Sequence, residues 1–284
     1  EKTSLNPVSE LQKIELFKEL IDGFPKNHLL KRYRGDVYYE IKNLQNLFSA
    51  MKREGWNQEF LQPRIDVYLE RIKTDENFKY KNSRKGQWGK GDYKPAYEEE
   101  KVRMEKLCAA VNEFKHFQDV MRQRNLYDFD DMINWVIKAF EENKNMLANY
   151  QEKYQYILVD EYQDTSGTQN KIVELLVSYW ENPNVFVVGD DDQSIFRFQG
   201  ANIENMESFA NGYADLLKIV LTNNYRSTQG ILDVSKTLIE RNNERLINKF
   251  EGLSKNLISS KEELMKLLHN PTIVEYKTTK DEMA

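Results

Sequence analysis

Two short apolar runs in the middle of the chain each end in acidic side chains. Residues 156–159 are followed by Asp160 and Glu161, and residues 185–188 by Gly189 and three aspartates. Runs of this length that stop at charged or turn-forming residues are typical of buried strands. Carboxylates at strand ends suit Mg²⁺ and can orient a water toward a phosphate. The spacing therefore predicts a ligand site at one edge of a parallel sheet.

The segment between the two runs predicts a helix. Residues 168–180 place apolar side chains at helical spacing, at Ile172, Leu175, Leu176, Tyr179 and Trp180. Strand, helix and strand form a βαβ unit with a right-handed crossover. The alternative for DEYQDT alone is a solvated turn after a strand. A second acidic strand end one crossover away favours a site for Mg²⁺ and a nucleotide.

A third group follows the apolar run 217–221, which predicts another strand. Tyr225 and Arg226 come directly after it. A guanidinium can bind two phosphate oxygens at once, and an aromatic ring can stack on a base. Taken alone, the pair also fits an aromatic residue packed beside a surface arginine. A last strand is expected over 272–276.

The three groups carry a resemblance to a known family. DEYQDT, GDDDQSIFRFQGA and NYRST, in this order and at this spacing, resemble motifs II, III and IV of superfamily 1 DNA helicases of the UvrD/PcrA/Rep type. YDFDD at 127–131 resembles a further motif of that family. The resemblance covers 127–245, with a weaker match at 271–276. It implies ATP and Mg²⁺ as cofactors and single-stranded DNA and duplex junctions as partners.

The resemblance also implies roles at the first strand end. Asp160 holds Mg²⁺ and Glu161 activates the attacking water, as the chemistry of motor ATPases requires of such carboxylates. Gln163 and Asp164 relay the state of the nucleotide to neighbouring motifs.

At the other two groups, the residues are expected to sense and grip the nucleotide. Gln193 hydrogen-bonds the γ-phosphate or the water and changes when the phosphate leaves. Arg226 binds the γ-phosphate and Tyr225 stacks on the adenine. Because the pair lies beyond an inferred domain junction near 211–217, ATP is expected to bind between two domains.

Aromatic residues are expected to contact DNA. Phe129, Phe196 and Phe198, with Arg197 between the last two, match family positions that face single-stranded DNA. Phe198 stands where the family usually has Trp, and Gln199 where it usually has Arg, so one positive charge on the DNA path is lost. Phe129 also begins a regular helical stripe, which leaves a core position open as its alternative.

A basic stretch lies within the N-terminal part. Residues 75–91 include KYKNSRKGQWGKG, where lysines and arginines alternate with Tyr80 and Trp88. Such a loop can contact a phosphate backbone and stack on bases, and the alternative is a solvated loop.

The expected fold is α/β with a large helical part. We expect an all-helical inserted domain over 1–118 that contacts DNA. Part of a first RecA-like motor domain, with its parallel sheet, follows over 119–214, and the start of a second motor domain over 215–284. Helices are predicted over 9–21, where Ser9 and Gln12 can form a capping box, and over 36–51, 59–72 and 97–124, with Pro63 limiting the third to a late start or a kink. Asp128 or Tyr127 is expected to begin a further helix.

Composition excludes several classes. The net charge of −5 argues against indiscriminate nucleic-acid binding, although DNA needs only a local basic track. The single cysteine, Cys108, excludes an internal disulfide and predicts a reducing cytoplasm. No apolar run is long enough to span a bilayer, so no membrane association is expected, and the protein is expected to be monomeric. The three histidines show no zinc-ligand spacing.

The phosphate-binding loop GxxxxGK[ST] is absent from the sequence. We therefore expect an internal segment of a longer helicase that, alone, does not turn over ATP. The function that the resemblance favours is an ATP-driven DNA helicase or translocase moving 3′ to 5′ in repair or replication. The alternatives are a non-hydrolysing DNA-binding or scaffold protein derived from a helicase, and a subunit of a helicase-nuclease.

Overall fold

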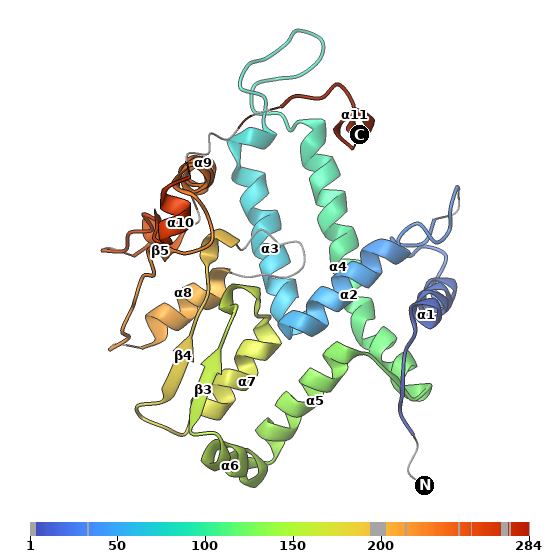
Figure 1. The fold of residues 1–284 in the computed structure, drawn as a ribbon. Helices are drawn as coiled ribbons and strands as arrows, with labels where there is room; N and C mark the ends of the chain where they lie inside the picture. Colours follow the sequence, from blue (N-terminus) through green and yellow to red (C-terminus); the bar gives the residue numbers. More distant parts are fainter. Residues whose placement is uncertain are drawn as a thin grey trace. The chain divides into compact units, whose positions relative to one another are not determined.

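The computed structural model describes residues 4–32, 34–193, 203–213, 215–243, 245–250, 252–267, 272 and 274–283. Helices dominate this part of the chain, and its strands are short and paired (Figure 1). The mixed α/β class is confirmed. The chain divides into two compact units, one of Glu1–Leu158 with Thr165–Phe186 and one of Val159–Asp164 with Val187–Ala284.

Four helices build the core of the first unit: α1 (Glu10–Gly23), α2 (Ile41–Glu54), α3 (Gln58–Thr74) and α4 (Pro95–Gln123). Ser9 begins α1 with the predicted capping box, in which its side chain and that of Gln12 each bind the other's backbone N–H. Aromatic rings fill the space between the helices, and Phe17 and Phe117 stack with ring centroids 4.3 Å apart. All four predicted helices are confirmed.

Pro63 lies inside α3 without ending it. The helix begins earlier than predicted, at Gln58, because the Asn57 side chain accepts a hydrogen bond from the backbone of Phe60. It continues through Pro63 to Thr74. Of the two alternatives for Pro63, the late start is therefore wrong, and the kink stays a prediction.

The basic stretch between α3 and α4 is ordered. After a 3-10 turn, η1 (Glu76–Phe78), it folds back on itself through antiparallel bridges of Lys79 with Tyr93 and of Arg84 with Trp88. Tyr80 and Trp88 stack on one another at 4.4 Å between centroids. Figure 1 shows the stretch as the loop that joins α3 to α4. Its aromatic rings are thus already paired with each other.

The rest of the first unit carries the strand–helix–strand segment. Strand β1 (Asn6–Pro7) pairs in parallel with β2 (Leu126–Tyr127), which leads into α5 (Phe129–Glu142) and α6 (Lys144–Lys153). Strands β3 (Tyr156–Val159) and β4 (Asn184–Val187) are hydrogen-bonded neighbours, with α7 (Gly167–Val177) between them in sequence. Helices α5 and α7 pack side by side (Figure 1). The predicted strand–helix–strand order is confirmed.

Burial of the two strands is a point on which the sequence was misleading. In β3 the exposed and half-buried residues alternate, and Leu158 is 73% exposed. Phe186 in β4 is 57% exposed. Within the described residues the sheet has only these two strands, and every second residue of each strand is exposed. The prediction that both strands are buried is therefore wrong.

The second unit is less regular. It contains η2 (Tyr162–Asp164), α8 (Ile203–Gly212), β5 (Asn223–Asn224), α9 (Gln229–Ile239), η4 (Leu246–Asn248), β6 (Ile258–Ser259), α10 (Glu262–Met265) and α11 (Thr279–Glu282). Strands β5 and β6 pair in parallel.

The strand predicted over 217–221 is wrong, because these residues are irregular and β5 begins only at Asn223. Leu217, Ile219 and Leu221 are 80%, 69% and 76% exposed. An extended run becomes a strand only where another strand pairs with it, and none does so here among the described residues. The same holds for 272–276, where 272 and 274–276 lie outside any strand. None of the helices in the described ranges combines the length and apolar character needed to cross a membrane.

Candidate functional site

The backbone brings the two acidic strand ends together. The Val188 N–H donates to the Val159 carbonyl at 2.8 Å, and the Tyr162 N–H donates to the Val188 carbonyl at 2.9 Å. Between these bonds, Glu161 adopts φ +49°, in the left-handed region that non-glycine residues rarely occupy. Such strained positions are concentrated at functional sites. The two acidic strand ends therefore lie side by side, and the backbone of Glu161 at one of them adopts an unusual conformation.

Asp160 fits the predicted contact with a metal ion. Its side chain is exposed, and its one hydrogen bond within the described part of the chain runs from the Glu161 N–H to Oδ1 at 2.9 Å. The other carboxylate oxygen is left for a hard cation. Mg²⁺ commonly takes one or two protein carboxylates together with water and phosphate oxygens. The described residues hold no group of three or more His, Cys, Asp or Glu side chains that could bind a metal ion.

Gln163 connects the two strand ends. It is buried, at 1% exposure, and its Nε2 donates to Glu161 Oε2 at 2.6 Å. Its Oε1 accepts from the Asp190 N–H at 3.0 Å. Gly189 makes this approach feasible, because a Cβ there would lie 2.7 Å from Gln163 Oε1. Sequence reasoning assigned no role to this glycine.

Gln193 extends the same series of contacts. Its side-chain Nε2 donates to Asp190 Oδ2 at 2.9 Å, and its backbone N–H donates to the Asp190 carbonyl. The structure thus brings Glu161, Gln163 and Gln193 together through Asp190. Asp164 lies at the end of η2, where it is exposed and its N–H donates to the Glu161 carbonyl at 2.8 Å.

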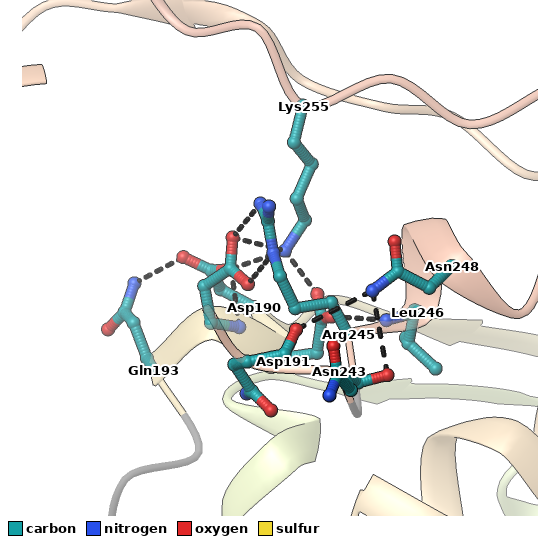
Figure 2. A network of polar contacts seen from close by, with 10 residues as sticks. Asp190, Asp191, Gln193, Asn243, Arg245, Leu246, Asn248 and Lys255 are labelled. Carbon is teal, nitrogen blue, oxygen red and sulfur yellow. Dashed lines mark hydrogen bonds and ion pairs between the residues drawn. The ribbon is translucent and has the colours of Figure 1, made fainter. Parts of the chain in front are cut away.

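Two basic residues that the sequence did not single out neutralise the aspartates of the second strand end (Figure 2). Lys255 Nζ lies 2.6 Å from Asp190 Oδ1, and Arg245 binds both carboxylate oxygens of Asp192 at 2.7 Å. Burial alone would raise the pKa of the Asp190 carboxyl, but the hydrogen bonds from Lys255 and Gln193 outweigh burial and lower it.

Tyr225 and Arg226 follow β5 in a turn built by Asn224. The Asn224 side-chain oxygen accepts from the N–H groups of Arg226 at 3.0 Å and Ser227 at 2.8 Å, an Asx turn. The Tyr225 ring is 63% exposed, and Arg226 is exposed as well. In the described part of the chain no hydrogen bond or ion pair ties either side chain to the acidic strand ends. Both remain free to contact a ligand.

Of the predicted DNA-contacting residues, Phe196, Arg197 and Phe198 lie outside the described residues. Phe129 is the first residue of α5, and its ring is 71% exposed. The core alternative for this ring therefore does not apply in the described structure.

A buried lysine that sequence reasoning missed supports the start of α5. Lys52 of α2 has 2% of its side chain exposed and lies 2.9 Å from Asp128 and 2.8 Å from Asp131. Burial acts to raise the pKa of Asp128, but the Lys52 charge and hydrogen bond outweigh burial and lower it. Lys52 thereby fixes the turn that presents Phe129.

Comparison with known proteins identifies the family of the chain. The model of the UvrD/REP helicase N-terminal domain matches residues 4–214. The chain is 42% identical over 133 residues to the ATP-dependent DNA helicase PcrA of Leuconostoc citreum, covering 47% of this chain and 18% of that protein. It is 43% identical over 132 residues to the PcrA proteins of Staphylococcus epidermidis and Staphylococcus aureus, covering 46% of this chain and 18% of each. The chain thus spans about a fifth of the length of these curated relatives. Because the family model matches well over half of its residues, the chain belongs to the UvrD/REP helicase N-terminal domain family.

Proposed function

We propose that this chain forms part of the motor of an ATP-dependent DNA helicase, which couples ATP hydrolysis to 3′ to 5′ movement on single-stranded DNA in repair or replication. The observation that carries the proposal is the Glu161 carboxylate, which accepts a 2.6 Å hydrogen bond from Gln163 on a backbone with φ +49°, next in the chain to the exposed Asp160. A water-activating base needs such fixed orientation. Membership of the family supports the same assignment.

Each side chain of the site then has a role with ATP. Asp160 would hold Mg²⁺, which when bound neutralises charge on the phosphates. Glu161 orients the attacking water and takes its proton, while Gln163 keeps that carboxylate in place. Gln193 senses the γ-phosphate, and Asp164 relays the change.

Arg226 and Tyr225 supply the other part of the nucleotide site. The exposed guanidinium binds γ-phosphate oxygens and the exposed ring stacks on the adenine. In this proposal residues 1–118 are the inserted helical domain, 119–214 belong to a first RecA-like domain and 215–284 to a second.

DNA contacts come from aromatic rings. Phe129 stacks on bases of single-stranded DNA, together with Phe196, Phe198 and the neighbouring Arg197. Duplex junctions are the second DNA partner. We further propose that the protein acts as a monomer in the cytoplasm.

The test is ATP turnover by the full-length protein with Glu161→Gln. We expect phosphate release that single-stranded DNA stimulates, and its loss in the variant, with binding of a fluorescent ATP analogue retained. Glu181→Gln is the matched control, because Glu181 is exposed and lies in the loop before β4. Undiminished turnover in the Glu161 variant would remove the proposed base.

The same assay separates the alternatives. A full-length protein that binds single-stranded DNA and releases no phosphate is the non-hydrolysing scaffold, and one that also cleaves DNA is the helicase-nuclease subunit. Residues 1–284 alone are expected to release no phosphate. Release by this segment that Glu161→Gln abolishes would contradict that expectation.

A further inference from the structure

We propose that Lys255 is a positioning residue that holds the Gln193 side and the Arg226 side of the candidate site in register. The inference rests on the proposed function, because it concerns how that nucleotide site is assembled. Lys255 lies in the segment between η4 and β6, more than 60 residues from every aspartate it contacts. It belongs to none of the helicase motifs recognised in the sequence.

Lys255 contacts three neighbouring aspartates. Its Nζ lies 2.6 Å from Asp190 Oδ1 and 3.5 Å from Asp192 Oδ2, and it also bonds Asp191. The Lys255 side chain is 20% exposed and that of Asp191 is 2% exposed. Figure 2 shows Lys255 reaching from its own segment to the acidic side chains. Three neighbouring carboxylates therefore share one ammonium group.

The rest of the cluster completes the charge balance. Arg245, with 5% of its side chain exposed, binds Asp192 through two bonds of 2.7 Å. The Leu246 N–H donates to Asp191 Oδ2 at 2.6 Å. Neighbouring carboxylates repel one another unless cations lie between them. Without Lys255, Asp190 and Asp191 would lose the ammonium group that each of them contacts.

The Asp190 carboxylate links Lys255 to Gln193. The two oxygens of Asp190 are divided between these residues, since Oδ1 accepts from Lys255 at 2.6 Å and Oδ2 accepts from Gln193 at 2.9 Å. The Asp190 N–H is held separately by Gln163. The ammonium therefore sets the rotation of the carboxylate, and the carboxylate sets the direction of the Gln193 amide.

The segment that carries Lys255 also contacts the backbone around Arg226. Three residues after Lys255, the Ile258 N–H donates to the Thr222 carbonyl at 2.9 Å and begins the pairing of β6 with β5. The Ser259 hydroxyl then donates to the Ser227 carbonyl at 2.9 Å. The segment that carries Lys255 thus also holds the backbone on both sides of Arg226.

Lys255 contacts the Gln193 side directly, and the segment that carries it contacts the Arg226 side through Ile258 and Ser259, so this lysine is suited to position the two sides together. The geometry predicts that losing the ammonium releases the Gln193 amide and loosens the link to the Arg226 turn, while Asp160 and Glu161 keep their own bonds. Binding of ATP is then affected little, and the hydrolytic step is affected strongly, because misplacement of about 1 Å can cost about 100-fold in rate.

The experiment compares Lys255→Met, Lys255→Arg and the control Lys261→Met in the full-length protein. Lys261 is exposed and pairs with Glu263 at 3.0 Å, six residues further along the chain. We expect Lys255→Met to lower kcat about 10- to 100-fold while changing the KM for ATP less than about threefold. Lys255→Arg should restore most of the rate, and Lys261→Met should match the wild type.

The outcomes separate this inference from the function on which it rests. A wild-type protein without DNA-stimulated phosphate release overturns the proposed function, and the inference with it. Normal turnover in Lys255→Met overturns the inference alone. So does an equal loss in kcat and thermal stability that Lys255→Arg fails to rescue, because that pattern marks a purely structural ion pair. If Lys255→Met does not fold, Asp190→Asn decides, and it must show the same fall in kcat with KM preserved.

Discussion

The side chain of Gln163 joins the Glu161 carboxylate to the backbone of Asp190. Its Nε2 donates to Glu161 at 2.6 Å and its Oε1 accepts from the Asp190 N–H at 3.0 Å. These two bonds fix the orientation of the amide, since only its nitrogen can donate. One buried side chain thereby couples the two strand ends that carry the candidate chemistry.

Gln163→Leu keeps the volume of the side chain and removes both hydrogen bonds. Because it leaves a backbone N–H and a carboxylate without their partner, we expect a loss of about 1–3 kcal/mol in the free energy of unfolding. ATP turnover by the full-length protein should also fall, since Glu161 loses its orientation. Urea unfolding and phosphate release measure the two effects. Gln155→Leu, at an exposed position, is the control, and equal behaviour of the two variants would refute the coupling.

Gly189→Ala tests the close approach of the second strand end to Gln163. The added Cβ would lie 2.7 Å from Gln163 Oε1 and 3.2 Å from the Met206 side chain. Overpacking of this kind destabilises a protein by about 1–3 kcal/mol, so we expect Gly189→Ala to have a lower unfolding midpoint in urea than the wild type. Gly212→Ala is the matched control, because in the described part of the chain no atom outside its immediate stretch of α8 lies within 4 Å of the added Cβ. An unfolding midpoint that is unchanged in both variants would show that the second strand end can move away from Gln163 without a loss of stability.

Lys52→Met removes the buried ammonium group that two half-buried carboxylates share. This ammonium lies within 3 Å of Asp128 and Asp131, and removing one partner of a buried ion pair typically costs about 3–5 kcal/mol. We expect this loss in the unfolding free energy at neutral pH. Lys138→Met, which disrupts an exposed pair with Glu142, should cost less than about 1 kcal/mol. Similar losses in the two variants would contradict the role of Lys52.

The loss of folding stability at acid pH should depend on Asp190. Its pKa is lowered in the folded protein, so its contribution is present above the unfolded pKa of about 3.9 and is lost as the pH falls through the lower, folded value. As the pH is lowered from about 6 to about 2, the thermal unfolding midpoint should therefore drop less steeply in Asp190→Asn than in the wild type. Parallel curves would exclude the contribution.

The loss of folding stability at alkaline pH should depend on Lys255. Burial acts to lower the pKa of its ammonium, but the hydrogen bonds to Asp190 and Asp191 outweigh burial and raise it. Its contribution to stability is thus fully present below the unfolded pKa of about 10.4 and is lost as the pH rises through the higher, folded value. Lys255→Met should remove that dependence from unfolding curves recorded above about pH 9.

Phe129→Ala separates DNA binding from stability. The ring is 71% exposed, so its removal should leave the unfolding midpoint unchanged. Stacking of a base on an aromatic ring is worth about 1–3 kcal/mol, and we expect a matching loss of affinity for single-stranded DNA in fluorescence anisotropy. Met132→Ala, on the same helix and 46% exposed, is the control. Equal affinity of the two variants would argue against stacking at Phe129.

Local signals in the sequence predicted the elements that depend on neighbours in the chain. The capping box of Ser9 and Gln12 marked the start of α1, and Asp128 began α5 as expected. The strand–helix–strand order over β3, α7 and β4 followed from spacing alone. Such features are predictable because a cap and a helical stripe involve residues only three or four positions apart.

The apolar run 217–221 shows where that reasoning fails. Its pattern is that of a strand, yet the segment stays irregular and the pairing begins at Asn223 with Ile258. Strand formation depends on a partner that the local pattern does not contain.

By itself, the sequence determined the family resemblance, the helices and the identity of the acidic and amide residues at two strand ends. Only the tertiary structure decided what holds those residues. Lys52 meets Asp128 across 76 positions and Lys255 meets Asp190 across 65. A lysine's charge and reach are the same at any position in a sequence, and only the fold selects which carboxylates lie within about 3 Å of it.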